Sequence, residues 1–150
     1  MAPAQASLLA KLDTQERVRD FLTNAVASGR ASHAYLFLGA PGAGKLDAAW
    51  ALAQAFLCEQ DGCGACDSCV RVARHTHPDV RYYTPESATG YLIAQTRELL
   101  DDVPLAPIRA KAKVYIIDRA EQLRANTANA LLKTLEEPPE GVMFILLGTS

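Results

Sequence analysis

A glycine-rich stretch near the start of the chain constrains its fold more than any other feature. Gly39-Ala-Pro-Gly-Ala-Gly-Lys45 follows the apolar run Ala34-Tyr-Leu-Phe-Leu38 and precedes residues 44–58, which are rich in Ala and Leu. Glycines let backbone N–H groups turn inward, and the start of a helix adds positive potential. The context predicts a phosphate-binding loop, in which Lys45 supplies a charge for the β- and γ-phosphates.

The residue after this lysine departs from the pattern of a hydrolytic site. The motif places Ser or Thr there, and its hydroxyl ligates Mg²⁺. This chain has Leu46 instead, and an alkyl side chain cannot ligate a hard cation. The sequence therefore predicts a loop that keeps its fold and has lost its metal chemistry. It leaves open the binding of nucleotide without efficient turnover.

A second departure follows the apolar run Lys113-Val-Tyr-Ile-Ile-Asp118. Asp118 would end a buried strand near the loop and hold Mg²⁺ through water, and a capping or buried structural carboxylate is the alternative. Many hydrolases with this loop follow the Asp with a Glu that polarises water, but here Arg119 occupies that position, and Glu121 should point elsewhere. Losing a general base commonly removes about 10²–10⁴ in rate, so we expect weak or absent ATPase activity and name no catalytic residue. The residues expected to contact a nucleotide are Gly39, Pro41, Gly42, Ala43, Gly44, Lys45, Leu46 and Asp118.

Apolar runs alternate along the chain with segments of helical periodicity, which predicts an α/β fold with a parallel sheet. The run at 34–38 is expected to be buried on both faces. A helix is expected after Asn126, its predicted N-cap. We expect a single domain over residues 1–150, as the N-terminal fragment of a longer chain. The predicted strands are 34–38, 80–84, 113–118 and 142–147, and the predicted helices are 7–29, 44–58, 91–101 and 128–137.

All four cysteines of the chain lie close together, as Cys58, Cys63, Cys66 and Cys69. Four thiolates at this spacing can enclose a tetrahedral Zn²⁺, so we expect a structural zinc insertion over about residues 58–69. An iron–sulfur cluster and two disulfides are the alternatives, and a reducing compartment opposes the disulfides. The nearby His75 and His77 are expected to have packing or surface roles rather than to be ligands, and His33, just before the first predicted strand, is expected to have a structural role.

Composition narrows the choice of partners and compartment. The 15 Lys and Arg against 17 Asp and Glu give a net charge of −2, so no basic excess indicates nucleic-acid binding. Any contact with DNA would be local or made by partners. The first residues carry no secretory pattern, and the chain has no apolar run of membrane-spanning length. We therefore expect a cytoplasmic protein.

Several longer strings resemble the bacterial clamp-loader ATPase family. They are His33-Ala-Tyr-Leu-Phe37 before the loop, His77-Pro-Asp79 after the cysteines, the run ending at Asp118, and Asn129-Ala-Leu-Leu-Lys-Thr-Leu-Glu-Glu-Pro-Pro139. The resemblance covers about residues 8–150, nearly the whole chain. It implies an AAA+ nucleotide-binding core with helices on both faces of a parallel sheet in the order 5-1-4-3-2, interrupted by the four-Cys zinc insertion.

The resemblance also implies partner proteins and different roles for the subunits. Members assemble into a ring-like complex of DNA polymerase III that opens a sliding clamp and places it on primed DNA. The partners would be gamma/tau and delta subunits, the clamp, and primer–template DNA reached mainly through the complex. The ATPase members, gamma/tau, carry Ser or Thr at position 46 and Glu at 119, so Leu46 and Arg119 favour the delta-prime type. Thr149 matches the family's sensor region, and an arginine-finger motif would lie beyond Ser150.

Two other functions are compatible with these residues. An active ATPase of the gamma/tau type predicts Mg²⁺-dependent turnover. A zinc-dependent module that contacts DNA directly is opposed by the low net charge, because phosphate contacts need several Lys or Arg.

Overall fold

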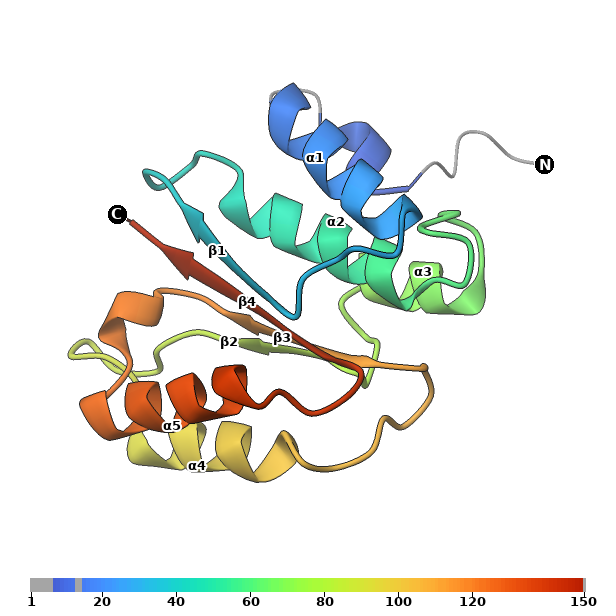
Figure 1. The fold of residues 1–150 in the computed structure, drawn as a ribbon. Helices are drawn as coiled ribbons and strands as arrows, with labels where there is room; N and C mark the ends of the chain where they lie inside the picture. The colour runs from blue at the N-terminus through green and yellow to red at the C-terminus, as the bar shows by residue number, and fades with distance from the viewer. Residues whose placement is uncertain (1–6, 13–14, 150) are drawn as a thin grey trace.

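A four-stranded parallel sheet forms the centre of the computed structural model, which describes residues 7–12 and 15–149 (Figure 1). The strand order is β1-β4-β3-β2, and each neighbouring pair is parallel. The predicted α/β fold and its four strands are confirmed, and the observed strand ends differ from the predicted ones by one residue at most. The strands are β1 (Ala34–Leu38), β2 (Val80–Tyr83), β3 (Lys113–Ile117) and β4 (Val142–Gly148).

Helices cover both faces of this sheet (Figure 1). On one face lie α1 (Glu16–Ala27), α2 (Lys45–Leu57) and α3 (Asp67–Ala73), and on the other lie α4 (Ile93–Asp102) and α5 (Ala125–Glu136). Two short 3₁₀ turns, η2 (Leu9–Lys11) and η3 (Ala120–Gln122), complete the described elements. No helix in the described ranges combines the length and the apolar character that crossing a membrane requires.

The core consists of two apolar layers separated by the sheet. Alternate residues of a strand point to opposite faces, so Val114 and Ile116 of β3 pack in the layer under α2. Tyr115 and Ile117 pack in the layer that α4 and α5 cover. Every residue of β3 is buried, as the continuous apolar run predicted. This central position holds Asp118 at the carboxyl edge of the sheet.

The expectation that β1 is buried on both faces is wrong. Tyr35 and Phe37 pack against the layer under α2. Leu36 and Leu38 point the other way, and their side chains are 61% and 56% exposed. The reason is position: β1 is an edge strand that pairs with β4 alone, and no described helix covers its second face.

Two helix predictions also need correction. The predicted helix 7–29 is two elements, because the chain leaves helical geometry at Leu12 and begins α1 only after Gln15; residues 13 and 14 lie outside the described residues. The last helix begins at Ala125 rather than 128. Asn126 is inside its first turn, where its side chain accepts the N–H of Thr127, so it is not the N-cap.

One helix was not predicted. The predicted helices include none in the cysteine segment, but α3 begins directly after Cys66, whose sulfur accepts the N–H of Cys69 as a side-chain cap. This seven-residue helix is too short to show a periodic apolar pattern.

Candidate functional site

The glycine-rich loop joins β1 to α2 and borders a cavity of about 370 Å³ at the carboxyl edge of the sheet. Gly42 and Gly44 have φ values of 84° and 89°, a left-handed conformation that glycine adopts without steric cost. Gly44 is also the N-cap of α2, so the start of that helix faces the cavity. The cavity is lined by Pro41, Gly42, Gly44, Lys45, Leu46, Asp47, Asp118, Arg119, Leu147 and Thr149.

Six of the eight residues expected to contact a nucleotide line this cavity, and two do not. Ala43 faces a second hollow of about 250 Å³ beside β1, where its carbonyl accepts Nε2 of Gln15 at 3.1 Å. Gly39 lies at the end of β1, where its carbonyl accepts a hydrogen bond from Lys45. The carbonyls of these two loop residues thus hold the shape of the loop, and neither residue lines the cavity.

Lys45 is held at the strand ends. Its Nζ donates to the carbonyl oxygens of Gly39 at 2.7 Å and Gly148 at 2.8 Å, which lie at the ends of β1 and β4. An ammonium group has three N–H donors. Two of them are committed to the backbone here, and the third makes no hydrogen bond to the described residues.

The carboxylate of Asp118 is already hydrogen-bonded on both oxygens. Oδ1 accepts the backbone N–H of Arg119 at 2.9 Å, and Oδ2 accepts the hydroxyl of Tyr82 at 2.8 Å. Burial raises the pKa of Tyr82, and its bond to the ionised Asp118 raises that pKa further. The hydroxyl of Tyr91 donates to the carbonyl of Asp118 and fixes the backbone there. Asp118 is therefore tied into β2 and its own turn while it lines the cavity.

The two departures from a hydrolytic site are both visible in the geometry. Leu46 packs against the apolar layer under α2 and presents only alkyl surface to the cavity. Arg119 has a φ of 49°, an unusual backbone conformation for a residue with a long side chain. Glu121 is not among the lining residues; it lies in η3 over the end of β4, near Gly148.

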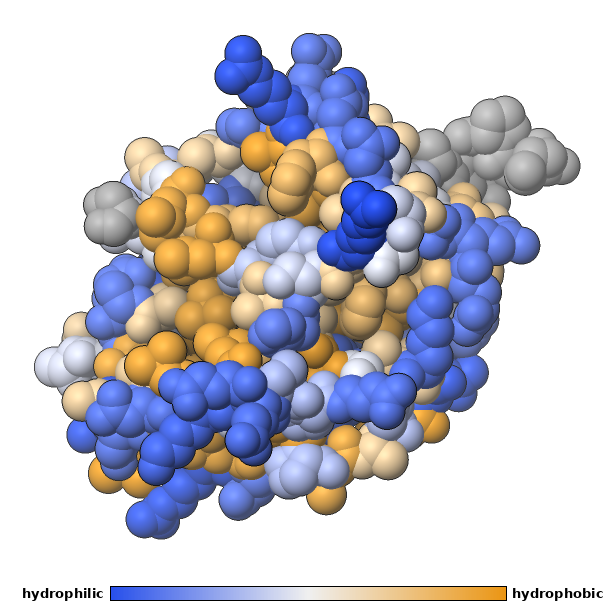
Figure 2. All heavy atoms as spheres, in the orientation of Figure 1, coloured by the Kyte–Doolittle hydropathy of each residue, from blue (hydrophilic) through white to orange (hydrophobic). Residues whose placement is uncertain are grey.

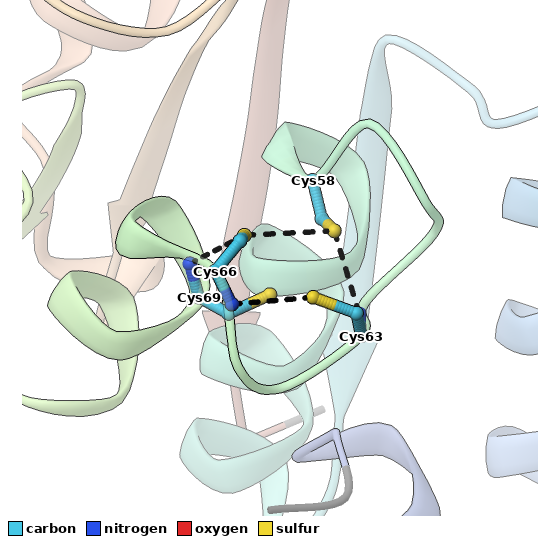
Figure 3. A group of neighbouring side chains, drawn as sticks. All are labelled: Cys58, Cys63, Cys66 and Cys69. Carbon is cyan, nitrogen blue, oxygen red and sulfur yellow. Dashed lines mark hydrogen bonds between the residues drawn. The ribbon is translucent and has the colours of Figure 1, made fainter. Parts of the chain in front are cut away.

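The four cysteines converge between α2 and α3 (Figure 3). Their sulfur atoms all lie within 4.8 Å of one another, and all four are free thiols. Cys58 is the C-cap of α2 and Cys66 the N-cap of α3, so two helix ends bring the ligands together. Tetrahedral coordination with bonds of about 2.3 Å separates neighbouring sulfurs by about 3.8 Å. The distance between the sulfurs of Cys58 and Cys66 is 3.9 Å.

Backbone amides point at these sulfurs. Cys58 Sγ accepts the N–H groups of Gln60 and Cys63, at 3.3 and 3.4 Å. The N–H groups of Ala65 and Cys66 lower the pKa of Cys63 to about 7, whereas burial raises the pKa values of Cys66 and Cys69. Thiolates are the form that binds metal, so the donors favour a bound ion. The cluster can hold one metal ion, and its four cysteines form no disulfide in this structure.

Buried polar residues connect the cysteine cluster and the segments around it to the rest of the molecule. Gln54 of α2 is 2% exposed; it donates to the carbonyl of Cys69 at 3.0 Å and accepts the N–H of Leu8 at 2.8 Å. Asp79 accepts three backbone N–H groups from residues 108–110 at 2.6 to 2.7 Å. Burial alone would raise the pKa of Asp79, but these three donors outweigh it and hold that pKa below its ordinary value.

The three histidines have structural roles in the described fold. His77 is buried, its Nδ1 accepts the N–H of Asp79, and burial lowers its pKa. His75 stacks on Trp50, with ring centroids 3.9 Å apart. His33 Nε2 lies 3.2 Å from the carbonyl oxygen of Leu135. None of them is part of the cysteine cluster.

Sequence reasoning missed the two tyrosines that hold Asp118. Tyr82 reaches it because β2 and β3 pair in a register that sets Tyr82 against Ile116, near the end of β3. Tyr91 comes from the segment between β2 and α4. The only signal was the placement of Tyr82 in a predicted strand, and its pairing partner is not readable from one sequence.

Comparison with known proteins gives consistent results. A family model described as "DNA polymerase III, delta subunit" matches residues 14–150. The chain is 43% identical to DNA polymerase III subunit tau of Escherichia coli over 139 residues, 90% of this chain and 21% of that protein. It is 40% identical to subunit delta' of Bacillus subtilis over 138 residues, 90% of this chain and 42% of that protein.

A solved structure of a gamma-subunit-related DNA polymerase III protein from Thermotoga maritima has the same fold, with a TM-score of 0.57 at 20% identity. The match covers 87% of this chain and 38% of the other. The chain thus spans less than half the length of each of these relatives.

Proposed function

Because the chain belongs to the DNA polymerase III delta-subunit family and is homologous to the delta-prime and tau subunits of clamp loaders, we propose that it serves as a clamp-loader subunit of the delta-prime type. In this role residues 1–150 are the AAA+ domain of a longer protein. It acts in the cytoplasm beside gamma/tau and delta subunits and helps to load the sliding clamp. Primer–template DNA is reached mainly through the complex, since the net charge of this chain is −2.

The observation that carries the proposal is a phosphate cavity without the groups that hydrolysis needs. Leu46 offers Mg²⁺ no oxygen, and Arg119 cannot accept a proton from water. Both oxygens of Asp118 already accept hydrogen bonds. Nucleotide hydrolysis relies on positioned metal ions and an oriented water, so the neighbouring gamma/tau subunits supply the turnover.

Reconstitution tests this role. Clamp loading onto primed DNA is measured with gamma/tau and delta subunits from the same organism, with and without the full chain. The proposal expects loading only when the chain is present, and ATP turnover that requires gamma/tau. Loading that is equally fast without the chain would refute it.

An active ATPase of the gamma/tau type is the second candidate. The observation in its favour is the 43% identity to a tau subunit, beside 40% to a delta-prime subunit, so overall identity does not separate the types. The two candidates differ in one property: only a gamma/tau subunit turns over ATP with Mg²⁺ when no other subunit is present.

We further propose that the cysteine cluster holds a structural Zn²⁺. A single ion with four thiolate ligands suits the mutual sulfur distances of up to 4.8 Å, whereas an iron–sulfur cluster would place the sulfurs on different iron atoms, farther apart. Four protein ligands leave no open position, so the ion supplies stability and no chemistry.

A further inference from the structure

The loop cavity lacks the hydroxyl that holds Mg²⁺ at such a loop, yet it keeps its features for binding phosphate. Mg²⁺ demands near-octahedral oxygen ligands, and the motif's Ser or Thr supplies one of them. Leu46 supplies none, and the side-chain oxygens of Asp118 already accept hydrogen bonds from the N–H of Arg119 and from Tyr82. Two of the loop glycines, the start of α2 and Lys45 still line the cavity.

Arg119 adds a cation to this cavity. Arg119 is among the residues that line the wall, and no carboxylate of the described residues lies within ion-pair distance of it. A guanidinium is permanently charged and presents a planar set of donors that matches phosphate oxygens. It can therefore supply positive charge to a polyphosphate where a metal ion lacks its hydroxyl ligand.

The backbone at Arg119 is held in an uncommon conformation. A left-handed φ of 49° is unfavourable for a residue with a Cβ, and such strain persists where the surroundings enforce it. Here Asp118 Oδ1 accepts the N–H of Arg119, and Tyr91 fixes the preceding carbonyl. Asp61 and His75 share this conformation outside the cavity, so the inference rests on the charge of Arg119 and not on its strain.

We propose that this cavity binds the polyphosphate of a nucleotide without Mg²⁺, with Arg119 in the place of the metal's charge. The inference rests on the proposed loss of turnover and concerns the same cavity. Asp47 and Asp118 also line the wall, and their negative charge opposes an anion. The affinity is accordingly modest, and it falls as salt is added.

Calorimetry on the full chain tests this inference, with ATP titrated in EDTA and again in excess Mg²⁺. We expect binding in EDTA that is at least as tight as binding with Mg²⁺. Arg119→Ala should weaken ATP binding in EDTA by about 10–100-fold, the effect of a lost charge-assisted contact. Arg97→Ala removes the same charge from exposed α4, outside the cavity, and should change the affinity by less than about twofold.

The variant Arg119→Gly tests whether a loss of ATP binding could come from misfolding rather than from the lost charge. Glycine adopts the left-handed backbone freely, so this variant should unfold at the same or a higher temperature than the parent while it loses ATP binding. An affinity that depends on Mg²⁺, or one that Arg119→Ala leaves unchanged, would overturn the inference.

A chain that binds no ATP in either buffer would also overturn it, but would leave the proposed clamp-loader role intact. Conversely, a chain that binds ATP without Mg²⁺ but is dispensable for clamp loading would contradict the proposed function alone. The two claims therefore fail separately.

Discussion

Lys45 and Asp118 show how single residues of the cavity are committed to the fold. The lysine bridges the ends of β1 and β4, and the aspartate links β3 to β2 through Tyr82. Each side chain therefore stabilises the carboxyl edge of the sheet as well as facing the cavity. These structural bonds do not depend on nucleotide hydrolysis.

The neighbouring tyrosines Tyr82 and Tyr83 give a matched test at this scale. Tyr82 donates to an ionised carboxylate, so Tyr82→Phe should lower the free energy of unfolding by about 1–2 kcal/mol. The buried hydroxyl of Tyr83 has no partner among the described residues, so Tyr83→Phe should be neutral or stabilising. Urea denaturation of both variants measures this difference. Equal losses in the two would show that the Tyr82–Asp118 bond contributes nothing.

Residue identities in the cavity were largely readable from the sequence, and their partners were not. The motif spacing located Lys45, Leu46 and Asp118 because a phosphate loop has a fixed local geometry. The bond from Tyr82 depends on the register between β2 and β3, which long-range pairing sets. The hydrogen bond from Lys45 Nζ to the carbonyl oxygen of Gly148 likewise joins residues that are 103 positions apart in the sequence.

At the scale of elements, α2 links the two sites of the molecule. Its N-cap is Gly44, the last glycine of the glycine-rich loop, and its C-cap is Cys58, the first cysteine of the cluster. Residues 48–53 of this helix are buried, so its position is set by the core. The strands and most helices were predictable because their apolar periodicity reflects that core. The helix α3 was not, because it is short and its first turn is organised by cysteine sulfurs.

Removing one cysteine of the cluster should destabilise this part of the fold. Cys66→Ser is expected to lose the proposed zinc and to lower the melting temperature by about 10 °C, since structural zinc contributes folding free energy directly. Ser68→Ala changes a hydroxyl in the same helix that has no partner among the described residues, and should keep both zinc and stability. Elemental analysis with thermal unfolding measures both. A metal-free parent chain that is fully folded would disprove the zinc assignment.

The Asp79 carboxylate should make stability depend on pH. It holds residues 108–110 against the start of β2, and Asp79→Asn should cost about 2–3 kcal/mol at pH 7. Its folded pKa lies below the unfolded value of 3.8, so this stability is present above pH 3.8 and is lost as pH falls through the lower folded value. The difference in the free energy of unfolding between the parent and Asp79→Asn should therefore disappear only in that acidic range.

Urea denaturation of the Asp79 pair across pH 2–7 tests this dependence. Glu98→Gln is the control, because its ion pair with Arg81 is largely exposed and should contribute little. If the difference in the free energy of unfolding between the parent and Asp79→Asn disappears near neutral pH, the pH dependence belongs to another group.

At the scale of the whole molecule, β1 leaves an open side on the sheet. Leu36 and Leu38 are more than half exposed there, and β1 pairs only with β4. Figure 2 shows apolar surface gathered around the ends of β1 and β4. Unpaired apolar edges favour association with another chain. The described residues thus form a core whose edge strand β1 exposes apolar side chains that can contact another chain.

We expect the 150-residue chain to self-associate or to be poorly soluble when isolated. Leu36→Lys should reduce this association, because a charge on an edge strand opposes pairing. Leu132→Lys adds the same charge at an equally exposed leucine of α5, away from the edge, and should help less. Light scattering measures the effect, and a clean monomer of the parent chain would contradict the expectation.

The most direct measurement is steady-state ATP turnover by the purified full chain, with Mg²⁺ and no other subunit present. Leu46 and Arg119 predict a rate indistinguishable from the protein-free background. Rapid, Mg²⁺-dependent turnover by the chain alone would contradict the account and identify an ATPase of the gamma/tau type.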